Sequence, residues 1–188
     1  MTGDGWFLDE SRYWVPGSES GAYPVRQGDL IAGFAAEGGD WAAAQIVHPT
    51  CDLGKPSVEK IQVARVRPLS ALSDDFSRSL VTAGYREVDG RRKVAVAHTS
   101  FLAPWSDGGE PSFVNFREIA SIDRRAASQE SRIVTMAHDC RVAWMRRWIY
   151  FRLRLPISYG RVREMEAMRI SADPMFEGPK PAWAAPDG

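Results

Sequence analysis

The residues best suited to chemistry lie in one short turn, His48-Pro49-Thr50-Cys51-Asp52-Leu53, which holds one of the two cysteines and one of the three histidines of the chain. The spacing suits a Cys51 nucleophile with an imidazole base, a role open to His48 or His98. The turn could equally be architectural. In that interpretation the proline ends a strand, Asp52 accepts backbone N–H bonds and the cysteine is a small buried filler.

In a third interpretation, the same turn provides half of the ligands of a zinc site. Zinc takes about four ligands, and the remaining candidates are His98, His138 and Cys140. The last two are two positions apart on a predicted helix and therefore point to different faces. The sequence gives no complete ligand set, so we expect no metal and no cofactor.

A set of arginines forms the second group of candidates. The chain is neutral overall, with 24 basic and 24 acidic residues, but residues 111–170 hold twelve arginines and no lysine. Guanidinium groups suit phosphate because they are planar, forked and always charged. If the third and fifth predicted strands are neighbours, these arginines share one face or rim and can bind RNA or DNA; the alternative is a solvated face paired with acids. The candidates are Arg65, Arg67, Arg117, Arg124 and Arg125.

Five strands and two helices must position these residues. Strands are predicted where apolar and polar residues alternate between turn signals. They cover residues 29–37, 41–48, 59–67, 91–97 and 113–122. Apolar residues spaced by four predict a short helix over 70–84.

The one long helix is predicted over residues 133–153, with an apolar arc that includes Met136, Trp144 and Phe151. We expect Trp144 and Phe151 to be buried. Arg147 falls inside the arc, so we expect it to pair with a buried acid, with Asp29 and Asp52 as the candidates.

Small SH3-like barrels have this order of elements, in which short strands are followed by one amphipathic helix. Three segments of the chain resemble one family with such a barrel, the PemK/MazF-like growth inhibitors of toxin–antitoxin pairs. Residues 26–31 (RQGDLI) resemble its RGDI(V/I) opening, and residues 60–69 (KIQVARVRPL) its (V)I(V)AP(I/L)T strand. Residues 114–125 (VNFREIASIDRR) are similar to its xVxxDQIxTIDRxR strand. The resemblance implies an α+β fold: a small SH3-like barrel of five to six strands with the C-terminal helix packed on it. It also implies RNA as substrate and a small antitoxin-like partner. The partners we consider are RNA or DNA, an antitoxin-like or defence-operon protein, and a second copy of the chain in a homodimer.

The chain departs from this family at the catalytic residues. The family's ribonucleases carry an arginine at the start of the second strand and a Ser or Thr after the third. Residues 41–47 contain no arginine, whereas Ser70 stands at the place of the hydroxyl. Attack by a ribose 2′-hydroxyl needs a base, an acid and a cation, so we expect no standard ribonuclease mechanism. The 48–53 turn resembles the (H/Q)xxCD(L/I) signature of a bacterial side branch.

Length and composition bound the organisation. At 188 residues we expect one domain with extensions: an aromatic arm over 1–24, the barrel and helix over 25–155, and a Pro-rich tail over 156–188. No apolar run approaches the ~20 residues that cross a bilayer, and the N-terminus lacks the pattern of a secretion signal. We therefore expect a cytoplasmic protein that does not bind membranes.

These observations favour a nucleic-acid-contacting module on a toxin-type barrel. Two alternatives from other classes stay open. One is a non-catalytic protein-interaction subunit of a bacterial defence or stress operon, in which tryptophans and the arm form the interface. The other is a thiol or metal site at Cys51.

Overall fold

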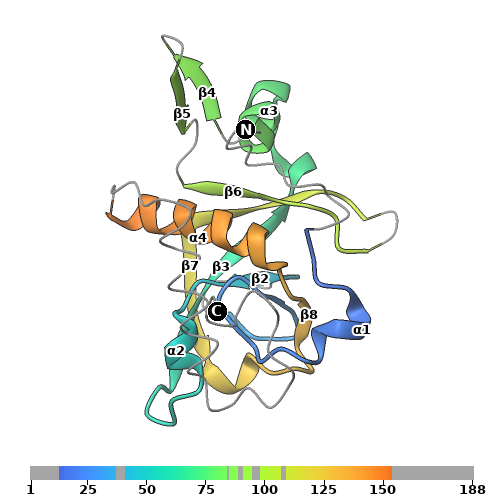
Figure 1. Cartoon of the computed structure of the whole chain (residues 1–188), viewed down its shortest axis with the longest axis vertical. Helices are drawn as coiled ribbons and strands as arrows, with labels where there is room; N and C mark the ends of the chain where they lie inside the picture. Colours follow the sequence, from blue (N-terminus) through green and yellow to red (C-terminus); the bar gives the residue numbers. More distant parts are fainter. Residues whose placement is uncertain are drawn as a thin grey trace, which may run out of the picture.

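The structure is a computed structural model that describes residues 13–36, 41–83, 85–88, 91–94, 98–106 and 109–153. Its centre is a six-stranded antiparallel sheet in the order β6-β7-β3-β2-β1-β8 (Figure 1). The strands are β1 (Leu30–Ile31), β2 (Ala44–Ile46), β3 (Lys60–Pro68), β6 (Thr99–Leu102), β7 (Ser112–Asp123) and β8 (Arg132–Val134). The predicted α+β class is confirmed, but the described strands run from β6 to β8 without closing into a barrel.

The two longest strands, β3 and β7, pair with each other in the middle of the sheet. The strands pair from Lys60 opposite Asp123 to Pro68 opposite Ser112, with an irregularity where β3 passes from Ala64 to Val66. Over those two steps β7 passes from Ile119 back to Val114, so its intervening residues leave the ladder. Extra residues of this kind bend a strand and redirect its side chains.

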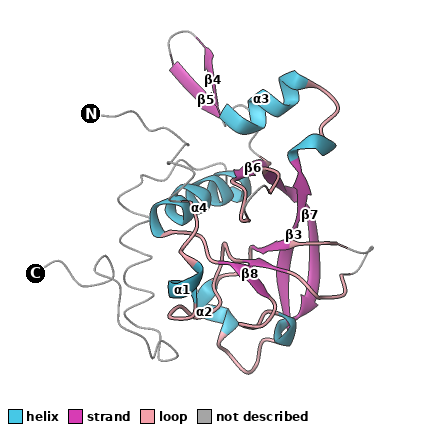
Figure 2. Ribbon diagram, turned by 90° about the vertical axis from the view of Figure 1, so that its right-hand side faces the viewer, coloured by secondary structure: helices cyan, strands magenta, loops and turns pink. Residues whose placement is uncertain are grey.

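Apolar side chains pack on both faces of the sheet. One core lies between the sheet and the helix α4 (His138–Leu153), which Figure 2 shows on one side of β3 and β7. It includes Leu30, Ala64, Phe116, Trp144 and Trp148. The second core lies on the opposite face, because neighbouring residues of a strand point to opposite sides. It includes Ile31, Ile46, Ile61, Val63 and Ile122.

The long helix begins five residues later than predicted. Ile133 and Val134 belong to β8, which pairs with β1. These are β-branched residues that favour an extended strand beside an open sheet edge. The buried residues of α4 cover more than half of its circumference at about 100° per residue, so they do not form one narrow stripe. They are His138, Cys140, Arg141, Val142, Trp144, Met145, Arg147 and Trp148.

The burial expected for the helix is confirmed at Trp144 and partial at Phe151. The ring centroids of Phe116 and Trp148 lie 5.0 Å apart, and those of Phe116 and Trp144 lie 5.8 Å apart. The pairing of Arg147 with a buried acid stays a prediction. Of its two candidate partners, Asp29 binds Arg26 and Arg132 and Asp52 binds Lys55. The charge of Arg147 acts on the buried Tyr13.

The remaining elements are short. They are α1 (Gly17–Ser20), α2 (Thr50–Leu53), α3 (Asp75–Ala83), β4 (Tyr85–Val88), β5 (Arg91–Val94) and two 3-10 turns, Leu69–Ala71 and Arg124–Ala126. Of the predicted strand over 91–97, residues 91–94 form β5, which makes a separate hairpin with β4 rather than joining the main sheet. Residues 95–97 lie outside the described part of the chain. The predicted strand over 29–37 shrinks to β1. No helix in the described part of the chain is long and apolar enough to span a membrane.

A buried cluster of charges fastens the N-terminal strand to β8 and α4. Asp29 is fully buried, 3.9 Å from Arg26 Nε and 3.5 Å from Arg132 Nη1. Gly28, at φ 96°, lets the chain pass close to Arg141, whose Cγ would lie 3.3 Å from an added Cβ. Burial raises the pKa of Asp29, and the arginines oppose that shift.

Candidate nucleic-acid interface

The end of β3 near Pro68 projects beyond its neighbour β2. The last ladder pair joins Ala44 to Arg65, and the N–H of Val66 then donates to the carbonyl of Ala43 at 3.2 Å. Past this point β3 is still paired with β7 on one side, while none of the described strands pairs with its other edge. We call this the open edge of β3. Alternation of side chains along the strand sends the odd and even residues of this end to opposite faces.

The odd-numbered residues at this end of β3 are two arginines, which lie on one face of the sheet. Arg65 Nη1 lies 3.8 Å from Glu118 Oε2, and Arg67 Nη1 lies 3.4 Å from Glu118 Oε1. Glu118 can reach both because it lies in the part of β7 that leaves the ladder. The Arg65 and Arg67 side chains are 36% and 42% exposed, so water screens these ion pairs and they hold the arginines weakly.

An aromatic residue lies beside this face, and a third arginine lies at the same end of the sheet. The guanidinium carbon of Arg65 lies 5.8 Å from the ring centroid of the partly buried Trp41. Arg117 is exposed next to Glu118 on β7. Half-exposed guanidinium groups beside an aromatic ring are the components of a single-stranded nucleic-acid surface. We call Trp41, Arg65 and Arg67 the basic face.

The structure separates the other two predicted arginines from this face. Arg124 Nε donates to the Val58 carbonyl at 2.9 Å and Arg124 Nη1 to the Leu53 carbonyl at 3.2 Å. Arg125 is exposed beside it. Both follow the far end of β7, roughly 20 Å along the strand from Arg117. The five predicted arginines therefore divide into three at one end of the sheet and two at the other.

The turn with His48, Cys51 and Asp52 lies at that other end, where α2 precedes β3. The Cys51 thiol is exposed and donates to Asp52 Oδ1 at 3.8 Å, while His48 Nε2 lies 3.9 Å from Asp52 Oδ2. Both groups thus face the carboxylate and not each other. The hydrogen bond from Lys55, at 2.6 Å, lowers the pKa of Asp52.

We expected Asp52 to hold the turn by accepting backbone N–H bonds, and this prediction is wrong. Asp52 accepts hydrogen bonds from side chains, not from backbone N–H groups. The turn is held instead by Thr50, whose Oγ1 accepts the Gln27 N–H at 3.0 Å, and by Arg124 on the Leu53 carbonyl. The cysteine predicted as a buried filler is exposed. Within the described residues, no group of three His, Cys, Asp or Glu side chains is placed to hold a metal ion.

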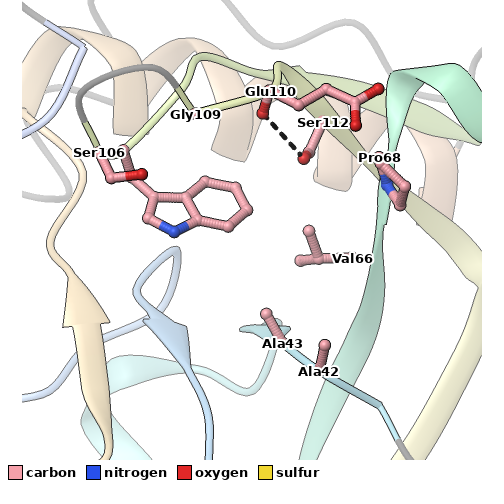
Figure 3. A pocket seen from close by; sticks show the side chains of 9 residues that line it. Ala42, Ala43, Val66, Pro68, Ser106, Gly109, Glu110 and Ser112 are labelled. Carbon is pink, nitrogen blue, oxygen red and sulfur yellow. Dashed lines mark hydrogen bonds between the residues drawn. The ribbon is translucent and has the colours of Figure 1, made fainter.

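Ser70 lies at the opposite end of β3 from His48, Cys51 and Asp52, so these four predicted site residues do not meet. The Ser70 N–H donates to Glu110 Oε1 at 2.9 Å. Glu110 also lines a pocket of about 260 Å³ at the open edge of β3 (Figure 3). The lining comes from β3, the residues just before β2, the loop before β7 and the first residue of β7: Ala42, Ala43, Val66, Pro68, Trp105, Ser106, Gly109, Glu110 and Ser112.

The loop wall of this pocket is held by one contact that is distant in sequence and by one local hydrogen bond. The Trp14 indole N–H lies 3.1 Å from the carbonyls of Ala103 and Pro104, immediately before Trp105. The N–H of Gly109 closes a turn onto the Ser106 carbonyl at 2.9 Å, and an added Cβ would lie 2.8 Å from that oxygen. Trp105 and Glu110 lie in a loop without periodicity, so no pattern in the sequence predicted them as site residues. Loops on a rigid sheet commonly carry function.

In comparisons with known proteins, no family model matches this chain, and a search of the curated proteins finds no match.

Proposed function

We propose that this protein binds single-stranded nucleic acid at the open end of β3, on a frame of the toxin-type, SH3-like barrel kind, and that it is not a standard ribonuclease. The observation that carries the proposal is the basic face. Arg65 and Arg67 share one strand face with Trp41, and both are exposed enough to exchange Glu118 for a phosphate. Surfaces that bind single-stranded nucleic acid generally combine cations that contact the sugar–phosphate backbone with aromatic rings on which bases stack.

The pocket beside Ser70 supports binding more than cleavage. In the family that the sequence resembles, this end of the second and third strands would hold the catalytic arginine and hydroxyl. Here Ala42 and Ala43 stand immediately before the second strand, β2, and none of the nine lining residues is basic. A developing phosphorane charge needs a cation close to it, and Arg65 and Arg67 extend from the other face of β3.

The test is fluorescence anisotropy with labelled twelve-nucleotide RNA and DNA single strands over a salt series. Affinity should fall with salt with a log–log slope of about −0.7 per phosphate contact. The double variant Arg65→Ala/Arg67→Ala should make the slope shallower by about 1.4. Arg125→Ala is the matched control, because Arg125 is exposed but lies outside the basic face, and should leave the slope unchanged.

Failure to bind either strand at low salt would overturn the proposal and favour the protein-interaction subunit. The same RNA, incubated with the protein in chelator and run on a gel, should stay intact. Metal-independent cleavage that disappears in Ser70→Ala would restore the ribonuclease assignment.

A further inference from the structure

The pocket at the open edge of β3 has the size and walls of a site for one planar ring. Its volume of about 260 Å³ lies just below the roughly 300–1,000 Å³ of pockets that take drug-sized ligands. Trp105 supplies an aromatic wall, while Ala42 and Ala43 supply a wall of single methyl groups. Flat bases of single-stranded nucleic acids bind by stacking on such aromatic side chains.

The polar groups of the pocket are mainly acceptors at one side. Glu110 Oε1 accepts the Ser70 N–H at 2.9 Å, which holds the carboxylate at the rim near Pro68 (Figure 3). A carboxylate has about four acceptor positions and no donor, so capacity for a ligand's donors is left after this bond. Ser112 Oγ–H, which donates to the Glu110 carbonyl at 3.4 Å, can rotate toward a ligand acceptor.

A carboxylate discriminates among the four bases by their Watson–Crick edges. Guanine presents two adjacent donors, N1–H and the N2 amino group, followed by the acceptor O6. Adenine and cytosine each present one amino group next to a ring nitrogen that accepts. Uracil and thymine place their single N–H between two carbonyl oxygens, which a carboxylate repels. Two charge-assisted hydrogen bonds are available to guanine alone.

We propose that this pocket binds a guanine base of single-stranded nucleic acid, stacked on Trp105 and held by Glu110 through N1–H and the N2 amino group. In this arrangement the Ser112 hydroxyl, which also lines the pocket, donates to O6. This inference rests on the proposed function. Val66 and Pro68 line the pocket while Arg65 and Arg67 extend from the opposite face of the same strand end, so the adjoining phosphates reach the basic face across the open edge.

The experiment measures the affinity of three labelled ten-nucleotide oligouridines that differ only at a central guanosine, adenosine or inosine. The guanosine strand should bind about tenfold tighter than the adenosine strand. The inosine strand, which lacks the N2 amino group, should lie between them. Glu110→Gln keeps an oxygen for the Ser70 N–H but replaces one acceptor with a donor, so it should remove the preference for the guanosine strand over the adenosine strand. Glu118→Gln, outside the pocket, should keep the preference.

The outcomes separate this inference from the proposed function. Equal binding of all three strands, or a preference that survives Glu110→Gln, overturns the guanine site and leaves nucleic-acid binding standing. No binding of any strand overturns both. Thermal stabilisation by arginine amide but not by guanosine monophosphate, lost in Glu110→Gln, overturns the guanine site and makes the pocket one for a basic side chain.

Discussion

Arg124, at the end of β7, donates to the Leu53 carbonyl at 3.2 Å and so ties the last strand of the long pair to the end of α2. Its Nε donates to a second carbonyl, that of Val58, at 2.9 Å. One guanidinium group therefore closes the loop between α2 and β3. In this position Arg124 is a support for the 48–53 turn and not a member of a phosphate-binding surface.

Replacing Arg124 with alanine should lower the free energy of unfolding by about 1.5–3 kcal/mol, because two carbonyls lose a charged donor. Urea denaturation followed by tryptophan fluorescence measures the change. Arg125→Ala is the matched control and should change stability by less than about 0.5 kcal/mol, because Arg125 is an exposed surface residue. Equal effects of the two substitutions would contradict the bracing role of Arg124.

The two cysteines should differ in reactivity. Cys51 is exposed and Cys140 is buried against the sheet. A disulfide reagent at pH 8 should modify one thiol rapidly in the native protein and two after unfolding, and Cys51→Ser should remove the rapid phase. Rapid modification of Cys140 in the folded protein would contradict its place in the core.

Cys140 also predicts a pH dependence of stability. Burial raises the pKa of its thiol from 9.0 to about 12, so the unfolded chain loses the proton first as the pH rises. The contribution of Cys140 is therefore present below pH 9 and is lost progressively between about pH 9 and 12. Denaturation of the wild type and Cys140→Ala at pH 8 and pH 10.5 should show a steeper loss in the wild type, and equal losses would contradict the prediction.

The helix core allows a graded test at Trp144. Its side chain is 2% exposed, and its indole N–H meets no acceptor among the described residues. Trp144→Ala should cost about 3–5 kcal/mol because it leaves a large cavity. Trp144→Phe retains most of the ring and sacrifices no hydrogen bond, so it should cost only about 1–2 kcal/mol. Similar costs for both, measured by urea denaturation, would show that this region repacks freely.

The long elements could be predicted from the sequence because their signals are local. The pattern over 113–122 corresponds to β7, and that over 59–67 corresponds to β3. The start of α4 could not be predicted, because Ile133 and Val134 fit the apolar arc of a helix as well as a strand. Only their pairing with β1, a contact across about a hundred residues, decides between the two.

The candidate site was less accessible to sequence reasoning. Arg65 and Arg67 could be proposed because a strand sends alternate residues to one face. Glu118 between them depends on the irregular pairing of β3 and β7, which leaves no sequence signal. The place of Trp105 depends on Trp14, about ninety residues earlier in the chain. Contacts of that range are set by packing and not by local propensity.

The pairing of Glu118 with both arginines gives the last prediction. A phosphate that binds Arg65 and Arg67 must displace this carboxylate, which lies within 3.8 Å of each guanidinium. Glu118→Gln keeps the size of the side chain but removes its negative charge, so nucleic-acid affinity should rise at low salt by about three- to tenfold. The gain should shrink as salt increases, because these partly exposed charges are screened. Fluorescence anisotropy at 50 and 300 mM salt measures both effects, with Glu130→Gln as a control at an exposed acid outside the basic face. An unchanged affinity in Glu118→Gln would mean that nucleic acid does not bind at these two arginines.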